Sequence, residues 1–216
     1  MAEIVYLDSP LESEALFERL CPPVRQWFKD KFPDFTPPQK LAIPAIMDQQ
    51  HLLLCSPTGS GKTLTAFLTV IDQLVRLALE RKLEKKVHAI YISPIKALAN
   101  DIQRNLIGPL NEITEHYLPD RAQEIRVGLR TGDTSQSDRQ KMLRNPPHIL
   151  ITTPESLAIA ITSPRFQPIV SEVEYMIIDE LHSMVSTKRG VHLSLTLSLL
   201  DSLLKNPVQR IGISAT

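Results

Sequence analysis

The sequence predicts an α/β domain with a mostly parallel central sheet and helices on both faces. Two observations carry this prediction: short apolar runs suited to strands alternate with helix-like stripes, and several of the runs lack alternating polar residues. Strands without polar alternation are typical of parallel sheets that are covered on both faces. The expected strands are HLLLC (51–55), VHAIYIS (87–93), IRVGLR (125–130), HILIT (148–152), YMIID (175–179) and RIGIS (210–214).

Helices are expected between these strands. Residues 64–78 place apolar side chains at spacings of three and four, the stripe of an amphipathic helix. Leu98, Ile102 and Leu106 repeat this spacing. The segment VHLSLTLSLL (191–200) fits both strand alternation and a helical face. Its apolar pattern runs for about 14 residues, longer than most strands, and this length favours a helix.

The first 50 residues are punctuated by proline and predict short helices before the first strand. We expect this region to pack on the core formed by residues 51–216 and to belong to the same structural domain. The prolines are Pro10, Pro22, Pro23, Pro33, Pro37, Pro38 and Pro44.

Composition narrows the class of protein. The 216 residues are 43% apolar and 22% charged, the profile of a globular domain rather than of a disordered or membrane chain. Basic and acidic residues balance at 24 each, so a polyanionic partner would have to be held by local groups. With neither a leader-like start nor a membrane-length apolar segment, an intracellular, cytoplasmic protein is expected. Cys21 and Cys55 lack metal-site spacing and are expected to be reduced thiols.

The run CSPTGSGKT lies between an expected strand and an expected helix, the context of a phosphate-binding loop. Glycines let backbone N–H groups close around phosphates, the lysine reaches the β- and γ-phosphates, and the following hydroxyl ligates Mg²⁺. The strict phosphate-loop pattern has glycine where this chain has Ser56. The alternative to a phosphate-binding loop is a plain turn with an exposed lysine. The candidate nucleotide-binding residues are Thr58, Gly59, Ser60, Gly61, Lys62 and Thr63.

A second motif ends the apolar run YMII with two adjacent acids. In phosphoryl-transfer sites of this class a strand ends in an aspartate that holds Mg²⁺, which assigns Asp179 to the metal alongside Thr63. Glu180 then lies near the γ-phosphate and can orient or deprotonate the attacking water. An acid pair alone indicates little more than a solvated strand end, but the phosphate loop gives it a catalytic interpretation, with Lys62, Asp179 and Glu180 as catalytic residues.

Together, SPTGSGKT, DELH and the terminal SAT resemble motifs I, II and III of superfamily 2 DExH-box helicases, in the order of that family. YISPIKALANDIQRNL and DELHSMVSTKRGVHLSLTLSLL are similar to the large helicase-related (Lhr) family. The resemblance covers essentially the whole chain. It implies a RecA-like P-loop fold, the first of two such motor domains.

FTPPQ resembles the Q motif of that family, in which Gln39 would read adenine. The alternative is a helix start with Thr36 as its cap and a solvated Gln39. Both interpretations can hold together. The resemblance also gives His182, Ser214 and Thr216 a coupling role between the nucleotide site and motif III.

Three further stretches resemble nucleic-acid-binding motifs of the family. They are SPIKALA, RTGD and TTPESL, with the candidate residues Ser93, Pro94, Lys96, Gly132, Thr153, Pro154 and Glu155. TTPESL also reads independently as a capped helix start, where free N–H groups attract an anion. Taken alone, each stretch is a plain loop or cap. Lys188 and Arg189 either contact a phosphate backbone or form a solvated loop.

The resemblance implies ATP- and Mg²⁺-dependent movement along single-stranded DNA or RNA, in the 3' to 5' direction. In that family the arginine finger lies in the second motor domain, so this chain alone is expected to bind nucleotide but to turn it over very slowly. Two alternatives remain open: a nucleotide-switched binding module that does not translocate, and a P-loop small-molecule kinase.

Overall fold

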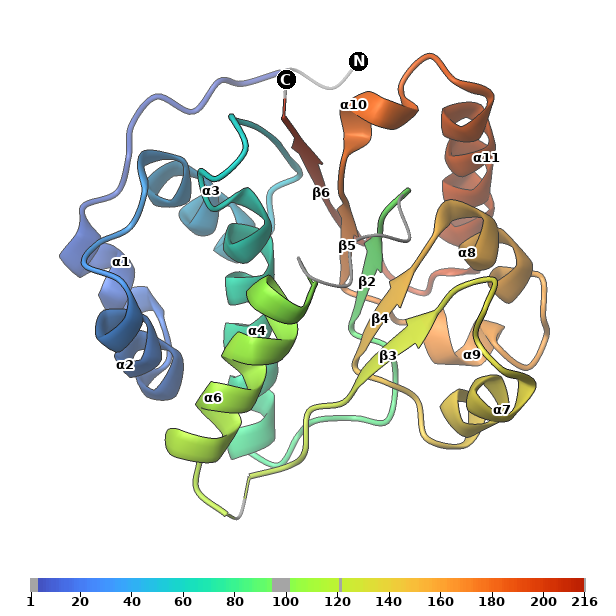
Figure 1. Cartoon of the computed structure of the whole chain (residues 1–216), viewed down its shortest axis with the longest axis horizontal. Coiled ribbons are helices and arrows are strands. Elements are labelled where there is room, and N and C mark those ends of the chain that lie inside the picture. The colour runs from blue at the N-terminus through green and yellow to red at the C-terminus, as the bar shows by residue number, and fades with distance from the viewer. Residues whose placement is uncertain (1–3, 95–101, 121, 216) are drawn as a thin grey trace.

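Figure 1 shows the computed structural model, which describes residues 4–94, 102–120 and 122–215. Six strands form one parallel sheet in the order β1-β6-β5-β2-β4-β3. They are β1 (Leu52–Cys55), β2 (Ala89–Ile92), β3 (Val127–Arg130), β4 (Ile149–Thr152), β5 (Tyr175–Ile178) and β6 (Gln209–Ser214). Each strand lies within its predicted run, except that β6 begins one residue earlier. The predicted α/β class with a parallel sheet is confirmed.

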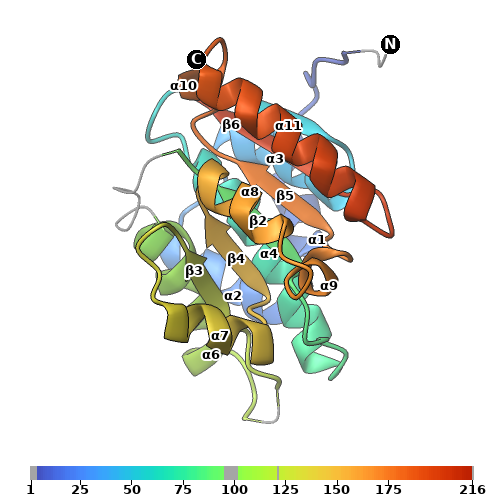
Figure 2. The same ribbon diagram turned by 90° about the vertical axis from the view of Figure 1, so that its right-hand side faces the viewer.

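Helices cover both faces of the sheet (Figures 1 and 2). One face carries α1 (Ser13–Arg19), α2 (Pro22–Lys31), α3 (Pro37–Met47), α4 (Lys62–Leu79), the π-helical turn η2 (Gln103–Ile107) and α6 (Gly108–His116). The other carries α7 (Gln136–Arg144), α8 (Pro154–Ile161), α9 (Gln167–Val170) and α11 (Lys188–Leu203), and the short α10 (Leu181–Met184) links β5 to α11. The predicted coverage of both faces is confirmed.

The core is divided by the sheet into two hydrophobic clusters. Tyr91 and Ile177 belong to the cluster that contains Phe67 of α4, whereas Ile90 and Met176 belong to the cluster that contains α8 and α11. Neighbouring residues of one strand therefore enter opposite clusters. Every residue of β2, β4 and β5 is buried, which explains why these strands show no polar alternation.

The two longest expected helices are present. α4 covers the amphipathic stripe that follows Lys62, and α11 covers the ambiguous leucine-rich segment. Of the third expected helix, Leu98 lies outside the described residues. Its later part continues from Ile102 into η2, a turn with wider i→i+5 hydrogen bonding, and then into α6.

The N-terminal helices pack on α4 through aromatic side chains. The rings of Phe28 and Phe35 stack with centroids 4.2 Å apart, and Phe17 lies 4.6 Å from Phe35. These rings share one cluster with Phe67 of α4. The division of the chain at residue 50 stays a prediction.

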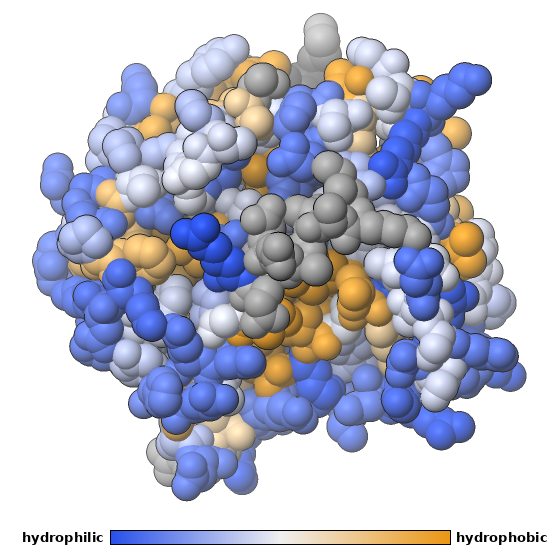
Figure 3. Space-filling model, in the orientation of Figure 1, coloured by the Kyte–Doolittle hydropathy of each residue, from blue (hydrophilic) through white to orange (hydrophobic). Residues whose placement is uncertain are grey.

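Polar side chains cover most of the face shown in Figure 3, with smaller apolar patches between them. Within the described ranges, no helix combines the length and the apolar character needed to cross a membrane.

Candidate active site

The carboxyl ends of β1, β6 and β5 lie side by side at one edge of the sheet. Cys55 pairs in register with Ser214, and Ile178 pairs with Gly212. The loop after β1 and the DELH stretch after β5 are therefore separated only by the end of β6. In open parallel sheets this edge is where ligands bind.

The loop after β1 closes around the Lys62 side chain. Gly59 and Gly61 have φ values of +81° and +86°, which other residues rarely adopt, whereas Ser56 does not have positive φ. The missing glycine at position 56 is therefore no obstacle to this loop. Instead the Ser56 hydroxyl donates to Ser60 Oγ at 2.8 Å. Thr58, at the exposed tip, completes the loop.

The Lys62 ammonium points back into this loop. It donates to the carbonyl oxygens of Pro57, at 2.7 Å, and of Ser56, which uses two of its three N–H donors. The side chain is only 8% exposed, so the alternative of a turn with an exposed lysine is wrong. Lys62 also opens α4, and the half-buried Thr63 is its second residue, so the positive end of the helix dipole faces the loop.

Gln39 lies against the same loop. Its side chain is 3% exposed, and its Oε1 accepts the Thr36 N–H at 2.8 Å. The Thr36 hydroxyl in turn donates to the Ser60 carbonyl at 3.0 Å. A Cβ added at Gly61 would lie 2.9 Å from Gln39 Nε2, so glycine is needed there for close approach as well as for φ. The expected helix start is present, but Gln39 is not solvated; its contact with adenine stays a prediction.

Asp179 is a buried carboxylate at the end of β5. The Tyr91 hydroxyl donates to Oδ2, and the Glu180 N–H donates to Oδ1 at 2.7 Å. Within the described residues no cationic side chain pairs with Asp179, which is 3% exposed. A buried charge of this kind calls for compensation.

The Thr63 hydroxyl and the Asp179 carboxylate are hard oxygen donors that suit Mg²⁺. The described residues contain no cluster of three or more His, Cys, Asp or Glu side chains suited to a metal. Mg²⁺ is often held by one or two protein oxygens together with substrate phosphates, and these two residues fit that mode.

Glu180, His182 and Ser214 form a continuous polar contact. Glu180 has φ +53°, and its Oε2 lies 3.1 Å from His182 Nε2. His182 Nδ1 accepts the Ala215 N–H at 3.3 Å and lies 3.2 Å from Ser214 Oγ. The ring proton therefore belongs on Nε2, where it donates to Glu180. This contact joins the expected motifs II and III; Thr216 lies outside the described residues.

Most of the expected nucleic-acid residues lie at the ends of β2, β3 and β4. Ser93 is buried and its hydroxyl has no partner among the described residues; Pro94 follows it, and Lys96 lies outside the described residues. Gly132 is exposed, and a Cβ added there would meet nothing within 4 Å. Their contacts with nucleic acid stay predictions.

The TTPESL stretch forms the expected capped helix start. Thr153 caps α8 by accepting the Ser156 N–H, and Pro154 is the first residue of the helix. Glu155 holds Arg189 through two hydrogen bonds, of 2.5 and 3.0 Å. Lys188 and Arg189 open α11 and do not lie in a loop, although Lys188 is exposed to solvent. Their contact with a phosphate backbone stays a prediction.

Two contacts of this edge were not expected from sequence. Tyr91 lies within an apolar run, which predicts only a core residue, whereas its hydroxyl donates to Asp179 in the structure. Glu155 and Arg189 are 34 positions apart, and only the fold brings them together. An acidic residue in the first turn of a helix was the one available signal for the second contact.

A cavity of about 650 Å³ lies at the opposite edge of the sheet, away from these residues. Its lining includes Asp72, Arg76 and Lys86, whose charges are compensated within the protein. Asp72 pairs with Arg76 at 2.7 Å, and Lys86 pairs with Glu84 at 2.8 Å. The predicted site residues do not line this cavity.

Comparison with known proteins agrees with this geometry. The sequence profile of the DEAD/DEAH box helicase family matches residues 36–216. The ATP-dependent helicase Lhr-Core of Methanocaldococcus jannaschii is 50% identical, with 100% of this chain and 26% of that protein covered. The Lhr helicase/uracil glycosylase of Escherichia coli is 46% identical, with 97% and 14% covered.

Solved structures give the same result. The Mycobacterium smegmatis helicase Lhr bound to ssDNA and AMP-PNP superposes with a TM-score of 0.82 at 46% identity, over 92% of this chain and 25% of that chain. Mss116p bound to ssRNA and AMP-PNP superposes with a TM-score of 0.76 at 20% identity, which supports the RecA-like fold alone. The chain spans about a quarter or less of the length of these Lhr relatives. It belongs to the DEAD/DEAH box helicase family and, within it, is a motor domain of the Lhr type.

Proposed function

We propose that this chain is the ATP-binding motor domain of a helicase that hydrolyses ATP to move along single-stranded nucleic acid. One observation carries the proposal: hydrogen bonds connect the phosphate loop to the acidic motif through β6. The Ser56 N–H donates to the Ser214 carbonyl at 3.3 Å, and Ser214 Oγ lies 3.2 Å from His182, which contacts Glu180. A change at the γ-phosphate has a physical route to the strand ends.

The nucleotide would be held by the residues at the start of α4. Backbone N–H groups at Thr58, Gly59, Ser60 and Gly61 would surround the phosphates, and Lys62 would exchange a loop carbonyl for a phosphate oxygen. Thr63 and Asp179 would hold Mg²⁺, which supplies charge neutralisation at the β- and γ-phosphates when bound. Gln39 lies against the loop and would contact the base, although its Oε1 already accepts from Thr36.

Glu180 would act on the attacking water. Its carboxylate accepts from His182 Nε2, so the histidine orients it without taking the proton. The two motif II acids then have separate tasks, since Asp179 is buried beside the expected metal and Glu180 is about one-third exposed.

The nucleic acid would cross the ends of β2, β3 and β4. The capped N-terminus of α8 supports an anion site at Thr153 and Pro154, and the M. smegmatis relative was solved with ssDNA. Single-stranded DNA is therefore the proposed track. RNA remains the alternative track, and the 3' to 5' direction rests on the family resemblance.

A second motor domain would complete the site. The Lhr relatives are about four times as long as this chain or longer, and phosphoryl transfer in this class depends on an arginine finger worth about 10³ to 10⁵ in rate. No residue placed at the nucleotide site within the described ranges supplies that arginine. We therefore expect this chain alone to bind ATP and to hydrolyse it very slowly.

The test begins with nucleotide binding. Lys62→Ala should weaken the affinity of this chain for a fluorescent ATP analogue by about 10-fold or more, because a charged hydrogen bond to phosphate is lost. Lys205→Ala is the matched control, since Lys205 is a lysine at the opposite edge that pairs with Glu172. Unchanged affinity of Lys62→Ala would contradict the phosphate-loop assignment.

Activity is then measured in a protein of Lhr length that carries this domain. ATP hydrolysis should rise on addition of single-stranded DNA, with single-stranded RNA as the parallel arm, and tailed duplexes give the direction of movement. Intact ATP binding without any stimulation by either strand would favour a nucleotide-switched binding module. Transfer of phosphate to an acceptor other than water would favour a kinase.

A further inference from the structure

Tyr91, on the central strand β2, contacts the carboxylate that is expected to hold the metal. Its phenolic O–H donates to Asp179 Oδ2, and the other carboxylate oxygen accepts the Glu180 N–H at 2.7 Å. Both side chains are buried, with exposed fractions of 0% and 3%. The carboxylate therefore has a hydrogen-bond donor on each oxygen, and this fixes its rotation about the Cβ–Cγ bond.

The tyrosine ring is held between the sheet and α4. Tyr91 pairs in register with Ile177 of β5, two residues before Asp179, so both side chains project towards the face that α4 covers. The ring centroid lies 4.8 Å from that of Phe67, five residues along the helix that begins at Lys62. The position of the hydroxyl is thus set by the same helix that carries the phosphate loop.

We propose that Tyr91 is a positioning residue for Asp179, which it orients so that the remaining lone pairs of the carboxylate face the magnesium ion. This inference rests on the proposed function. A carboxylate has about four acceptor sites, and the two hydrogen bonds leave two for a metal or its water ligands. Without the hydroxyl, the carboxylate gains rotational freedom. In other proteins, loss of a residue that hydrogen-bonds to a metal ligand lowers metal affinity by about 10- to 100-fold.

The experiment measures the affinity of this chain for a fluorescent ATP analogue across a Mg²⁺ titration, with EDTA as the metal-free reference. Tyr91→Phe keeps the ring against Phe67 and removes only the hydroxyl. It should bind nucleotide like the wild type in EDTA, while its half-saturating Mg²⁺ concentration should rise by about 10-fold.

The matched control is Tyr175→Phe. Tyr175 begins β5, is 4% exposed, and its hydroxyl accepts from Gln49 Nε2 at 3.2 Å, at the opposite end of the strand from Asp179. Its removal should leave the Mg²⁺ midpoint unchanged. Because a merely structural role of Tyr91 would lower the thermal unfolding temperature without moving this midpoint, both quantities are recorded for each variant.

The outcomes separate the two proposals. A wild type that gains no nucleotide affinity from Mg²⁺ contradicts the proposed function and this inference together. A normal wild type with an unshifted Tyr91→Phe midpoint contradicts the positioning role alone, as does an equal shift in both tyrosine variants. If Tyr91→Phe does not fold, Phe67→Leu loosens the ring while keeping the hydroxyl. That variant should raise the midpoint, and an unchanged value overturns the inference.

Discussion

Glu180 combines a constrained backbone with a positioned carboxylate. Its φ of +53° is uncommon for a residue with a side chain and costs of order 1 to 3 kcal/mol, so the surrounding contacts must hold it. One of these is the 3.1 Å contact of its Oε2 with His182 Nε2. Uncommon backbone conformations cluster at functional sites, which agrees with the proposed role at the attacking water.

Glu180→Gln should therefore separate binding from turnover. Glutamine keeps the shape and an acceptor for His182 but cannot take a proton, so ATP affinity should stay within about two-fold while the hydrolysis rate falls by about 100-fold or more. The rate is measured in the Lhr-length protein, with Glu115→Gln, an exposed acid on α6, as the control of equal charge change. Normal turnover in Glu180→Gln would refute the base role.

At this scale the sequence is informative where a residue type is rare in its surroundings. Two glycines and a lysine between a strand and a helix, and two acids after an apolar strand, are unusual enough to predict the phosphate loop and its acidic partner. The contact of Tyr91 with Asp179 could not be predicted from the sequence. A tyrosine within AIYI gives the same sequence pattern whether or not its hydroxyl meets a carboxylate. Its partner depends on which strands become neighbours, and β2 and β5 are far apart in the chain.

Among the elements, α11 shows why its segment has two periodicities. Leu193 and Leu200 are buried on the sheet side, whereas Val191 and Leu195 are 63% and 67% exposed. Apolar residues on both sides of a helix produce a strand-like alternation in the sequence. The length of the pattern predicted the element correctly, while periodicity alone could not, because it assumes that only one side of an element is apolar.

The join between α10 and α11 depends on a close approach at Gly190. A Cβ at this position would lie 2.2 Å from the Met184 carbonyl oxygen, and the Gly190 N–H donates to the capping Thr187 hydroxyl at 3.1 Å. Alanine normally stabilises a helix by up to about 1 kcal/mol relative to glycine. Here the backbone of α10, which follows Glu180 directly, would have to move.

Gly190→Ala should accordingly destabilise the protein by about 1 to 3 kcal/mol, the usual range for overpacking, as measured by urea unfolding. Gly132→Ala is the control, since an added Cβ there meets nothing within 4 Å and φ is not positive. Equal stability of the two variants would show that α11 moves aside without cost.

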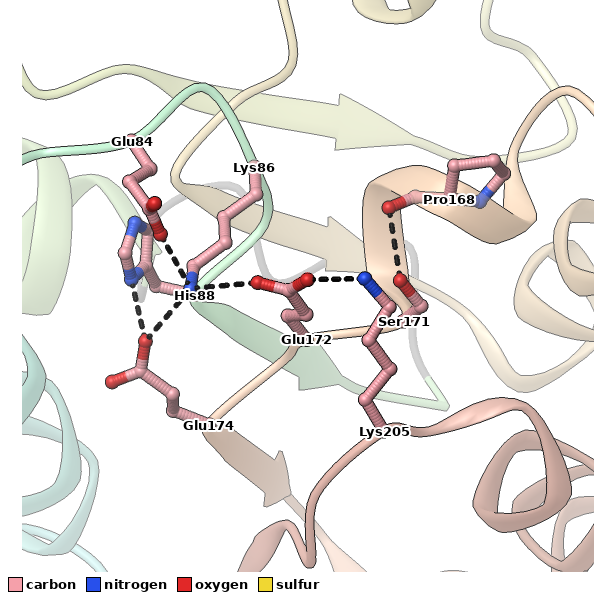
Figure 4. A network of polar contacts seen from close by, with 8 residues as sticks. All are labelled: Glu84, Lys86, His88, Pro168, Ser171, Glu172, Glu174 and Lys205. Carbon is pink, nitrogen blue, oxygen red and sulfur yellow. Dashed lines mark hydrogen bonds and ion pairs between the residues drawn. The ribbon is translucent and has the colours of Figure 1, made fainter.

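On the scale of the whole molecule, titratable groups gather at the amino ends of the strands, opposite the candidate site. Lys86 joins Glu84 at 2.8 Å and Glu172 at 3.3 Å, and His88 Nδ1 lies 2.9 Å from Glu174 (Figure 4). The two edges of the sheet thus differ in how far their charges are compensated. At the amino edge the described charges largely compensate one another, whereas at the carboxyl edge Asp179 and Lys62 lack ion-pair partners among the described residues.

His148 lies buried beside this amino-edge network. Burial, the Arg126 guanidinium and His88 together lower the pKa of His148 from 6.5 to about 3. The ring accepts the Arg126 N–H at Nδ1, at 2.9 Å, while a guanidinium nitrogen lies 3.0 Å from Nε2. The neutral ring is therefore the folded form. Below about pH 6.5 the unfolded chain binds a proton that the folded chain does not, and folding loses up to about 1.4 kcal/mol for each pH unit.

His148→Asn should reduce this dependence on pH. Asparagine offers a carbonyl oxygen to the Arg126 N–H but does not titrate, so its free energy of unfolding should fall less than that of the wild type between about pH 7 and pH 5. Urea unfolding at several pH values measures the difference, with His116→Asn, an exposed histidine, as the control. Parallel pH profiles for wild type and His148→Asn would mean that the acid sensitivity arises elsewhere, and the carboxylates around Lys86 would then be the next groups to replace.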